Sequence, residues 1–412
     1  MPLKTRTIGP FAKNIILVFA GISLVNFLNL LYQLLIAHRL TPAEFAAFNS
    51  LLAIFTVISA PFGTIQMAVA KYCAQFQAQG NIQKVKLLLS VFFKRALLLA
   101  GVTLLVFGLF SSGITRALGI PSFYSGYILA VLLALAWLSP VLSGGIQGLE
   151  LFRWLAGSSV LSSLLKLGLA VIFVGLGYGI AGALGALLVA SLFSIFICYL
   201  PLRDYLYTDV SGEDIKYREI LLFLLPVALS SFCFMALVNF DMVLVKYYFT
   251  PEESGVYSLA QMLGKIFLFL PASISVVMFP RASALNAKNM ETATTLKRSL
   301  LYVLGLCLSA YIFYSLFPSF TLRVLTGKSS SSAITLGRLF GISMSFFTAT
   351  YLLISYFLSI KEFRFIKYLV ASCLLQYLAI AFFHPSLFAV QFILCVNALL
   401  LFCVNLALAY KR

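Results

Sequence analysis

Four charged side chains stand inside long segments of the sequence that are otherwise apolar. Lys166 and Lys265 each lie near the middle of such a segment, whereas Asp241 and Arg338 lie closer to the ends of two others. A charged group at the centre of a lipid bilayer costs at least about 2.5–3.5 kcal/mol, so it normally faces the protein interior or a water-filled cavity. Ammonium and guanidinium groups in such places attract anions, and a carboxyl group can take up a proton or a cation.

The basic residues in these segments outnumber the acidic ones, because Asp241 is the single carboxylate against Lys166, Lys265 and Arg338. This imbalance predicts a cavity that accepts an anionic group. Two interpretations of Asp241 stay open: a structural ion pair with Lys265 on the next helix, or the uptake of a proton or cation. Arg338 either binds the ligand or extends its side chain to the nearby membrane interface.

Polar side chains also recur along one face of the first apolar segment. Ser23, Asn26, Asn29 and Gln33 follow each other at spacings of three or four residues, which places them on one side of a helix. Such a row either holds helices together or lines a wet cavity. Asn239 stands at roughly the matching place in the second half of the chain, which favours a cavity wall with contributions from both halves.

Several kinds of catalytic or cofactor site are not indicated. No glycine-rich loop followed by Lys and Ser or Thr is present, so ATP hydrolysis by that route is excluded. Two histidines without metal-ligand spacing and seven cysteines without a Cys-x-x-Cys pair argue against a metal site. We therefore expect no enzyme activity, no catalytic residue, no bound metal and no cofactor.

The elements that must position these residues are membrane-spanning helices. Of the 412 residues, 62% are hydrophobic and 10% are charged, whereas soluble proteins are about half apolar and about a quarter charged. This composition excludes a soluble enzyme, a nucleic-acid-binding module and a disordered scaffold. Apolar runs of about 20 residues predict twelve transmembrane helices in an all-α, polytopic membrane protein.

The distribution of basic residues predicts how this protein lies in its membrane. Most of the 29 Lys and Arg residues fall into the loops on one side, together with both ends of the chain. Cytoplasmic loops are enriched in these residues, so we expect both termini in the cytoplasm and a multi-pass protein of the cytoplasmic (inner) membrane. The anionic lipids of the inner leaflet explain the net charge of +17, and no nucleic acid is needed as a partner.

The chain repeats itself at an offset close to half its length. Thr41-Pro42-Ala43-Glu44 returns as Thr250-Pro251-Glu252-Glu253, 209 residues later, and each motif is followed by a proline (Pro61, Pro271) and a basic residue (Lys71, Arg281). We expect two homologous six-helix lobes, 1–205 and 206–412, around a central cavity. Paired repeats of this kind occur in secondary transporters, which bind their substrate between the repeats.

Several short motifs carry a resemblance to a known family. They are Leu40-Thr41-Pro42-Ala43-Glu44-Phe45 with Pro61 and Lys71-Tyr72, then Gln147-Gly148 with Phe152, the block from Asn239 to Phe249, and Gly255-Val256-Tyr257-Ser258 with Gly264-Lys265. Together they resemble the bacterial polysaccharide and oligosaccharide flippases (O-antigen-flippase-like), which belong to the superfamily of multidrug-and-toxin extruders and lipid II flippases.

The resemblance implies a flippase that moves a polyprenyl-diphosphate-linked oligosaccharide across the membrane by alternating access. Its partners would be this substrate, membrane lipids, a coupling H⁺ or Na⁺, and proteins of polysaccharide assembly. A diphosphate needs cations and sugars need amides and hydroxyls, which agrees with the residues above. Among the candidates, Asp241, Asn239 and Lys265 fall within the matched motifs; Lys166, Arg338 and the polar row on the first helix do not.

Three alternatives remain open. A cation-coupled extruder of drugs or other organic cations has the same fold, but it is expected to carry more carboxylates in its helices than the single Asp241. A membrane polymerase or glycosyltransferase would use the same lipid-linked sugars, but it needs acid–base groups and larger outer loops. A purely structural bundle would explain neither the repeat nor the buried charges.

Overall fold

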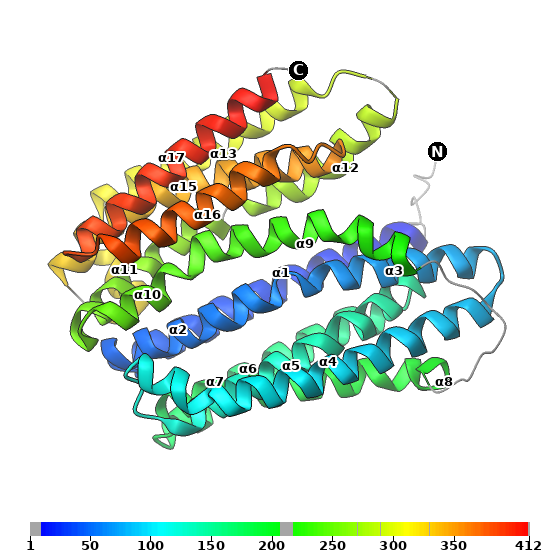
Figure 1. Ribbon diagram of the computed structural model, residues 1–412, viewed down its shortest axis with the longest axis horizontal. Coiled ribbons are helices and arrows are strands. Elements are labelled where there is room, and N and C mark those ends of the chain that lie inside the picture. The colour runs from blue at the N-terminus through cyan, green and yellow to red at the C-terminus, as the bar shows by residue number, and fades with distance from the viewer. Residues whose placement is uncertain (1–9, 207–216, 270, 289, 329, 411–412) are drawn as a thin grey trace, which may run out of the picture. The chain divides into compact units, whose positions relative to one another are not determined.

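The computed structural model describes residues 10–206, 217–269, 271–288, 290–328 and 330–410, and within these residues it contains helices and no strand (Figure 1). The helices are α1 (Pro10–Arg39), α2 (Pro42–Ser59), α3 (Phe62–Ala78), α4 (Ile82–Ala117), α5 (Phe123–Gly148), α6 (Phe152–Gly175), α7 (Gly179–Tyr199), η1 (Leu200–Leu202), α8 (Arg203–Leu206), α9 (Tyr217–Asn239), α10 (Asp241–Tyr248), α11 (Pro251–Phe269), α12 (Ala272–Ala287), α13 (Ala293–Leu316), α14 (Pro318–Thr326), α15 (Ser331–Ser359), α16 (Phe365–Phe382) and α17 (Leu387–Tyr410).

Most of the helices, singly or joined end to end, are long and apolar enough to cross a membrane. Over the described residues there are eleven such spans, and a twelfth is reached if the bent pair Leu224–Asn239 and Asp241–Tyr248 is one span. The two helices of this pair meet at 41°. The prediction of an all-α polytopic protein is confirmed, and the predicted number of twelve depends on the bent pair, whose second helix begins at Asp241.

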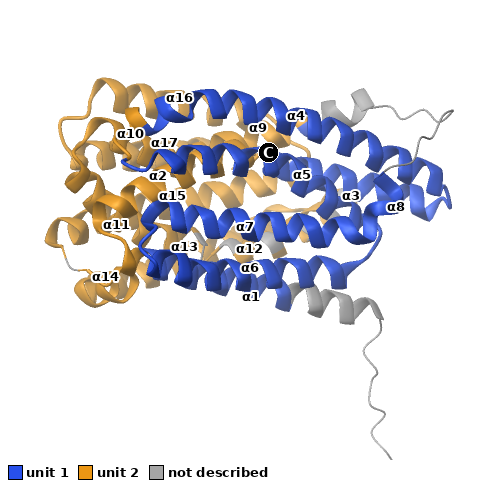
Figure 2. Ribbon diagram, turned by 90° about the horizontal axis from the view of Figure 1, so that it is seen from below, with its two compact units in different colours: residues 1–36, 62–115, 121–224 blue, residues 37–61, 116–120, 225–412 orange. Residues whose placement is uncertain are grey.

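The chain folds as two compact units, each described by itself (Figure 2). Unit 1 consists of residues 1–36, 62–115 and 121–224, and unit 2 of residues 37–61, 116–120 and 225–412, as far as these residues are described. Helix α2 belongs to unit 2 although it precedes most of unit 1 in the sequence. The division into lobes at residues 205 and 206 stays a prediction, and most of the linker after it lies outside the described residues.

The sequence repeat has a counterpart in the start of helices α2 and α11. The amide N–H of Thr41 donates to the Glu44 carboxylate at 2.9 Å, and the Glu44 N–H donates back to the Thr41 hydroxyl at 3.3 Å. Thr250 and Glu253 make the same two bonds at 3.1 and 3.3 Å. Each pair is a capping box, which satisfies backbone N–H groups that an N-terminal turn leaves without partners.

Helices α2 and α11 pack against each other inside unit 2. The Asn49 side chain donates a buried hydrogen bond of 2.8 Å to the hydroxyl of Ser258, 209 residues further along the chain. At Gly255 the approach is so close that a Cβ atom would lie 2.8 Å from the Cβ of Pro42. The hydrogen bond therefore joins residues separated by the repeat offset, and the close approach of the helices at Gly255 leaves no room for a Cβ atom.

Unit 1 contains a comparable close contact between α3 and α5. A Cβ atom on Gly144 would lie 2.8 Å from the backbone carbonyl oxygen of Gln66, and one on Gly148 would lie 2.7 Å from that of Ala70. The two glycines are four residues apart and share one face of α5. Small residues at this spacing let membrane helices approach closely, and this contact fixes the register of α3 on α5.

Candidate functional site

In unit 1 the ammonium group of Lys166 on α6 lies against helix α1. Its Nζ donates a hydrogen bond to the side-chain oxygen of Asn29 and lies 4.6 Å from the ring centroid of Tyr32. The Tyr32 hydroxyl donates in turn to the backbone carbonyl of Ala183 on α7, at 2.8 Å. Three helices thus place one cation beside an amide and an aromatic ring.

The partners of Lys166 are uncharged. Within the part of the chain that the structure describes, this residue forms no ion pair. A cation over a tyrosine ring is stabilised by about 0.5–2 kcal/mol, which does not neutralise its charge. An incoming anion would form a charge-assisted hydrogen bond, which is roughly twice as strong as a neutral one. The arrangement suits the binding of an anionic group.

Tyr32 is an addition to the predicted set of residues. It lies three residues after Asn29, so the two side chains share a face of α1. That spacing, with an aromatic residue beside an amide in an apolar helix, is the signal in the sequence that could have identified it.

The polar row on α1 divides into residues with and without partners. Asn29 and Gln33 are half-buried, whereas Ser23 and Asn26 are exposed. Asn26 and Gln33 make no hydrogen bond among the described residues, so they do not hold helices together there. Lipid offers no hydrogen-bonding partners to an amide. The exposure of Asn26 well inside a membrane-spanning helix therefore favours a wet surface over a helix contact.

In unit 2 the carboxylate of Asp241 is fully buried and bound by two side chains of α11. The Tyr257 hydroxyl donates to it at 2.8 Å, and the Gln261 amide donates to both of its oxygens at 3.1 Å. Lys265 is near enough to act on the carboxylate electrostatically, but no ion pair between them lies within 4.0 Å. Hydrogen bonds thus replace the direct ion pair that was one interpretation of Asp241.

Tyr257 and Gln261 were not among the predicted residues. Together with Lys265 they recur every fourth residue, so all three follow one face of α11. That face meets Asp241 because α10 starts at this residue, after the bend in the chain at Phe240. The spacing is visible in the sequence, whereas the bend that brings Asp241 to it is not.

The remaining predicted residues are not brought into these clusters. Asn239 is buried and donates to the backbone carbonyl of Met235 in its own helix, at 3.0 Å, so its side chain has a local role. Arg338 is exposed on α15, and its charge acts electrostatically on Tyr314 of α13. Among the described residues it contacts no other candidate.

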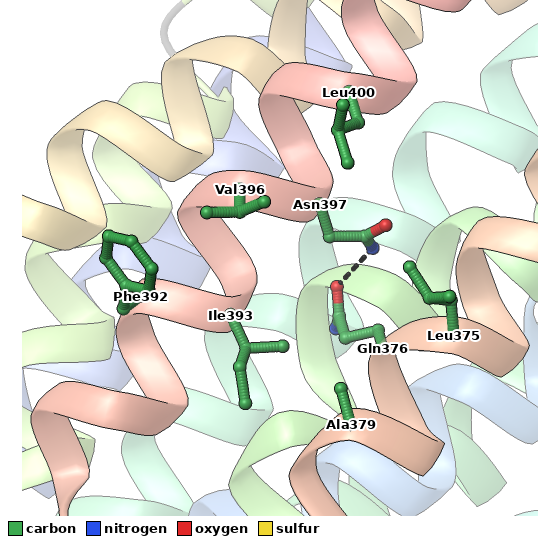
Figure 3. A pocket seen from close by; sticks show the side chains of 8 residues that line it. All are labelled: Leu375, Gln376, Ala379, Phe392, Ile393, Val396, Asn397 and Leu400. Atoms are coloured by element: carbon green, nitrogen blue, oxygen red, sulfur yellow. Dashed lines mark hydrogen bonds between the residues drawn. The ribbon is translucent and has the colours of Figure 1, made fainter. Parts of the chain in front are cut away.

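A groove of about 190 Å³ between α16 and α17 carries no free polar group (Figure 3). At its floor Asn397 donates to Gln376 at 2.8 Å, Gln376 donates to the backbone carbonyl of Leu237, and Ser372 donates to Asn397. The other lining residues are apolar: Leu375, Ala379, Phe392, Ile393, Val396 and Leu400. Because its amides are already paired, the groove does not suit a phosphate or a sugar.

Side chains of the types that bind metal ions do not cluster in the part of the chain that the structure describes. Among the described residues no three His, Cys, Asp or Glu side chains lie together in a way that could hold a metal ion. His384 stacks on the ring of Tyr248, with 4.0 Å between the centroids, and its Nδ1 lies 2.9 Å from the backbone oxygen of Ile380. This histidine has a packing role.

Solved structures with the same fold are membrane transporters. The chain is similar to a multidrug resistance MATE family transporter of the MOP superfamily in its inward-facing conformation, with 15% identity, a TM-score of 0.74, and coverage of 96% of this chain and 98% of that one. It is similar to the lipid II flippase MurJ, inward closed, with 14% identity, a TM-score of 0.71, and coverage of 96% and 88%.

A third similar structure is a MOP superfamily transporter from Pyrococcus furiosus, whose binding pocket is described as having reverse polarity. The identity is 18%, the TM-score 0.67, and the coverage 96% of this chain and 94% of that one. At these identities the likeness establishes the fold, a two-lobed all-helical membrane protein. The comparison with curated proteins finds no match.

The family itself is established by sequence. The family model described as "Polysaccharide biosynthesis protein" matches residues 11–286, which is most of the chain and includes Asn29, Lys166 and Asp241. The chain therefore belongs to the polysaccharide biosynthesis protein family, and it has the fold of the MATE and lipid II flippase transporters.

Proposed function

We propose that this protein is a flippase that moves a polyprenyl-diphosphate-linked oligosaccharide, or a similar polysaccharide precursor, across the cytoplasmic membrane by alternating access. The observation that carries the proposal is the Lys166 ammonium group, whose partners Asn29 and Tyr32 are both uncharged. Membership of the polysaccharide biosynthesis family supports it. We place both termini in the cytoplasm, on the evidence of the basic loops.

The chemistry of such a substrate fits the residues of unit 1. The diphosphate carries the negative charge that Lys166 lacks among its neighbours. Sugar hydroxyls both donate and accept hydrogen bonds, as do the exposed amide of Asn26 and the half-buried amide of Gln33. The polyprenyl tail needs no polar site and can stay in the bilayer. No bond of the substrate is broken in this process, so no catalytic residue is required.

We further propose that Asp241 couples transport to H⁺ or Na⁺. Its carboxylate is buried, accepts hydrogen bonds from neutral groups of Tyr257 and Gln261, and has Lys265 nearby without a direct ion pair. A cation bound there would neutralise the carboxylate and weaken its attraction for Lys265, which would leave the Lys265 ammonium free for an anion. Ion binding and substrate binding would then be linked within unit 2.

The direct test is transport by the purified protein in liposomes. A fluorescent polyprenyl-diphosphate oligosaccharide is placed in both leaflets, and its movement is followed by the fraction accessible to an impermeant quencher. We expect flipping that depends on the protein and on the diphosphate, and none with a neutral prenyl-linked glycan. If the neutral lipid moves equally fast, the proposed role of the cation is wrong.

One observation favours an alternative function, the cation-coupled extrusion of organic cations. The buried carboxylate of Asp241 is the group that such a transporter would use, and one of the similar structures is a multidrug transporter. The same liposomes separate the two functions, since an extruder would accumulate a dye such as ethidium under an imposed ion gradient. A lipid-linked-sugar polymerase or transferase would instead change the mass of the glycan, and we do not favour it.

A further inference from the structure

A pair of glutamines in unit 1 has hydrogen-bonding capacity that the protein does not use. The Nε2 of Gln66 on α3 donates to the Oε1 of Gln147 on α5, at 3.2 Å. Neither side chain has another partner among the described residues. The Oε1 acceptor and one N–H of Gln66, and both N–H donors of Gln147, are therefore available to a ligand beside the pair.

The pair is held in place by the backbone rather than by its own hydrogen bond. Gly144 and Gly148 bring α5 into contact with α3, and the Cβ that Gly144 lacks would lie 2.8 Å from the backbone oxygen of Gln66. Gln147 stands next to Gly148, so its side chain leaves α5 at the edge of this contact. Two amides fixed on two packed helices form a preorganised site.

Space is available beside the pair. Gln147 is exposed and Gln66 half-buried. One turn before Gln66, a Cβ atom on Gly63 would have no atom within 4 Å, and the neighbouring Met67 is 57% exposed. The amides thus border an accessible surface that also offers an apolar side chain.

Neutral amides beside an apolar side chain suit a sugar better than a phosphate or a hydrocarbon. Adjacent hydroxyls of a sugar ring each donate and accept, which matches the free Oε1 acceptor of Gln66 and the three free N–H donors of the pair. The C–H face of the ring can lie on an apolar side chain such as Met67. A phosphate has no donors to give and would seek the cation at Lys166, and a hydrocarbon would leave the amides unpaired.

We propose that the Gln66–Gln147 pair is a glycan-binding subsite that receives hydroxyl groups of the oligosaccharide. The inference rests on the proposed function in that the glycan is the head group of the transported lipid. Gln147 lies near the end of α5, six residues before Arg153 in the first turn of α6, and the basic residues predict that the connection between these helices is cytoplasmic. The subsite is therefore at the end of unit 1 where a substrate made in the cytoplasm would enter.

Binding of free glycan tests the subsite without relying on transport. The probe is the set of oligosaccharides released by mild acid from the surface polysaccharide of the organism that carries this chain. Their binding to the full-length protein in detergent is measured by saturation-transfer NMR and calorimetry. We compare wild type with Gln66→Leu and Gln147→Leu, and use Gln75→Leu as control because Gln75 is an exposed glutamine of the same helix. Melting temperatures verify that all variants fold.

We expect each of the two leucine variants to bind the oligosaccharides about tenfold more weakly than wild type, which corresponds to about 1.4 kcal/mol, and the control to bind normally. Equal binding by all four proteins, or no binding by wild type, would overturn the subsite. The liposome assay is run in parallel on the lipid-linked form. If the wild-type protein binds free glycan but does not flip the lipid-linked form, the proposed function is refuted and the subsite remains supported.

Discussion

Replacing Lys166 by methionine separates a binding role of this lysine from a structural one. Methionine keeps much of the length of the aliphatic side chain and removes the charge and the hydrogen bond to Asn29. Tyr32 keeps its hydrogen bond to the carbonyl of Ala183, so its ring stays in place. The substitution therefore removes the charge at this position, with the two contacts that the ammonium group makes, and leaves the surrounding side chains in place.

The effect on stability is expected to be small. The variant loses a hydrogen bond from a charged group, about 1.5–3 kcal/mol, and the cation–ring contact with Tyr32, about 0.5–2 kcal/mol. Against this, removing an ammonium group from water costs several kcal/mol, and methionine avoids that cost. The opposing contributions nearly cancel, so we expect the free energy of unfolding of Lys166→Met to stay within about 1 kcal/mol of wild type.

The effect on transport is expected to be large. If Lys166 binds the diphosphate, the variant loses a charge-assisted hydrogen bond of about 1.5–3 kcal/mol, which corresponds to a loss of about tenfold to 150-fold. The assay is flipping of the polyprenyl-diphosphate oligosaccharide in liposomes, with thermal unfolding measured on the same preparation. Lys166→Arg keeps the charge and should retain much of the activity.

A lysine with a structural role provides the matched control. In unit 2 the Nζ of Lys328 donates to the backbone carbonyls of Ala37 and Leu40 and so caps the end of α1. Lys328→Met should lower the melting temperature and leave the preference for a charged substrate unchanged. The reasoning about Lys166 is refuted if its methionine variant behaves in the same way, with lower stability and normal transport.

Three further predictions concern unit 2. Asp241→Asn should abolish the dependence of transport on an imposed H⁺ or Na⁺ gradient, measured in liposomes; an unchanged dependence would exclude this residue as the coupling group. Asn49→Leu should lower the free energy of unfolding by about 1–3 kcal/mol because it leaves the Ser258 hydroxyl buried without its donor, and adding Ser258→Ala should recover part of the loss in denaturant unfolding. Gly255→Ala should cost about 1–3 kcal/mol because its Cβ would lie 2.8 Å from that of Pro42, and a normal melting temperature would show that the contact relaxes.

Much of the candidate site in unit 1 could be predicted from the sequence. A lysine in an apolar helix and amides at helical spacing indicate by themselves that they avoid lipid. The pairing of Lys166 with Asn29 could not be predicted, because the two residues are 137 positions apart and the rotation of α6 against α1 depends on packing. For the same reason Tyr32 and its bond to Ala183 were missed.

In unit 2 the direct ion pair of Asp241 with Lys265, one of the two interpretations that the sequence left open, is not formed. Asp241 and Lys265 do affect each other, but Tyr257 and Gln261 hold the carboxylate. A pattern of residues shows which side chains share a helix face. It does not show which of them is nearest to a group on another helix, since that depends on the bend before α10.

The sequence alone determined that this is an all-helical, polytopic membrane protein with an internal repeat, because hydropathy and capping motifs are local properties that add up along the chain. The tertiary structure decided which polar groups meet: Lys166 with neutral partners, Asp241 with Tyr257 and Gln261, and Gln66 with Gln147. Those contacts depend on how closely and at what rotation distant helices pack, which glycines such as Gly144 permit but no short segment specifies.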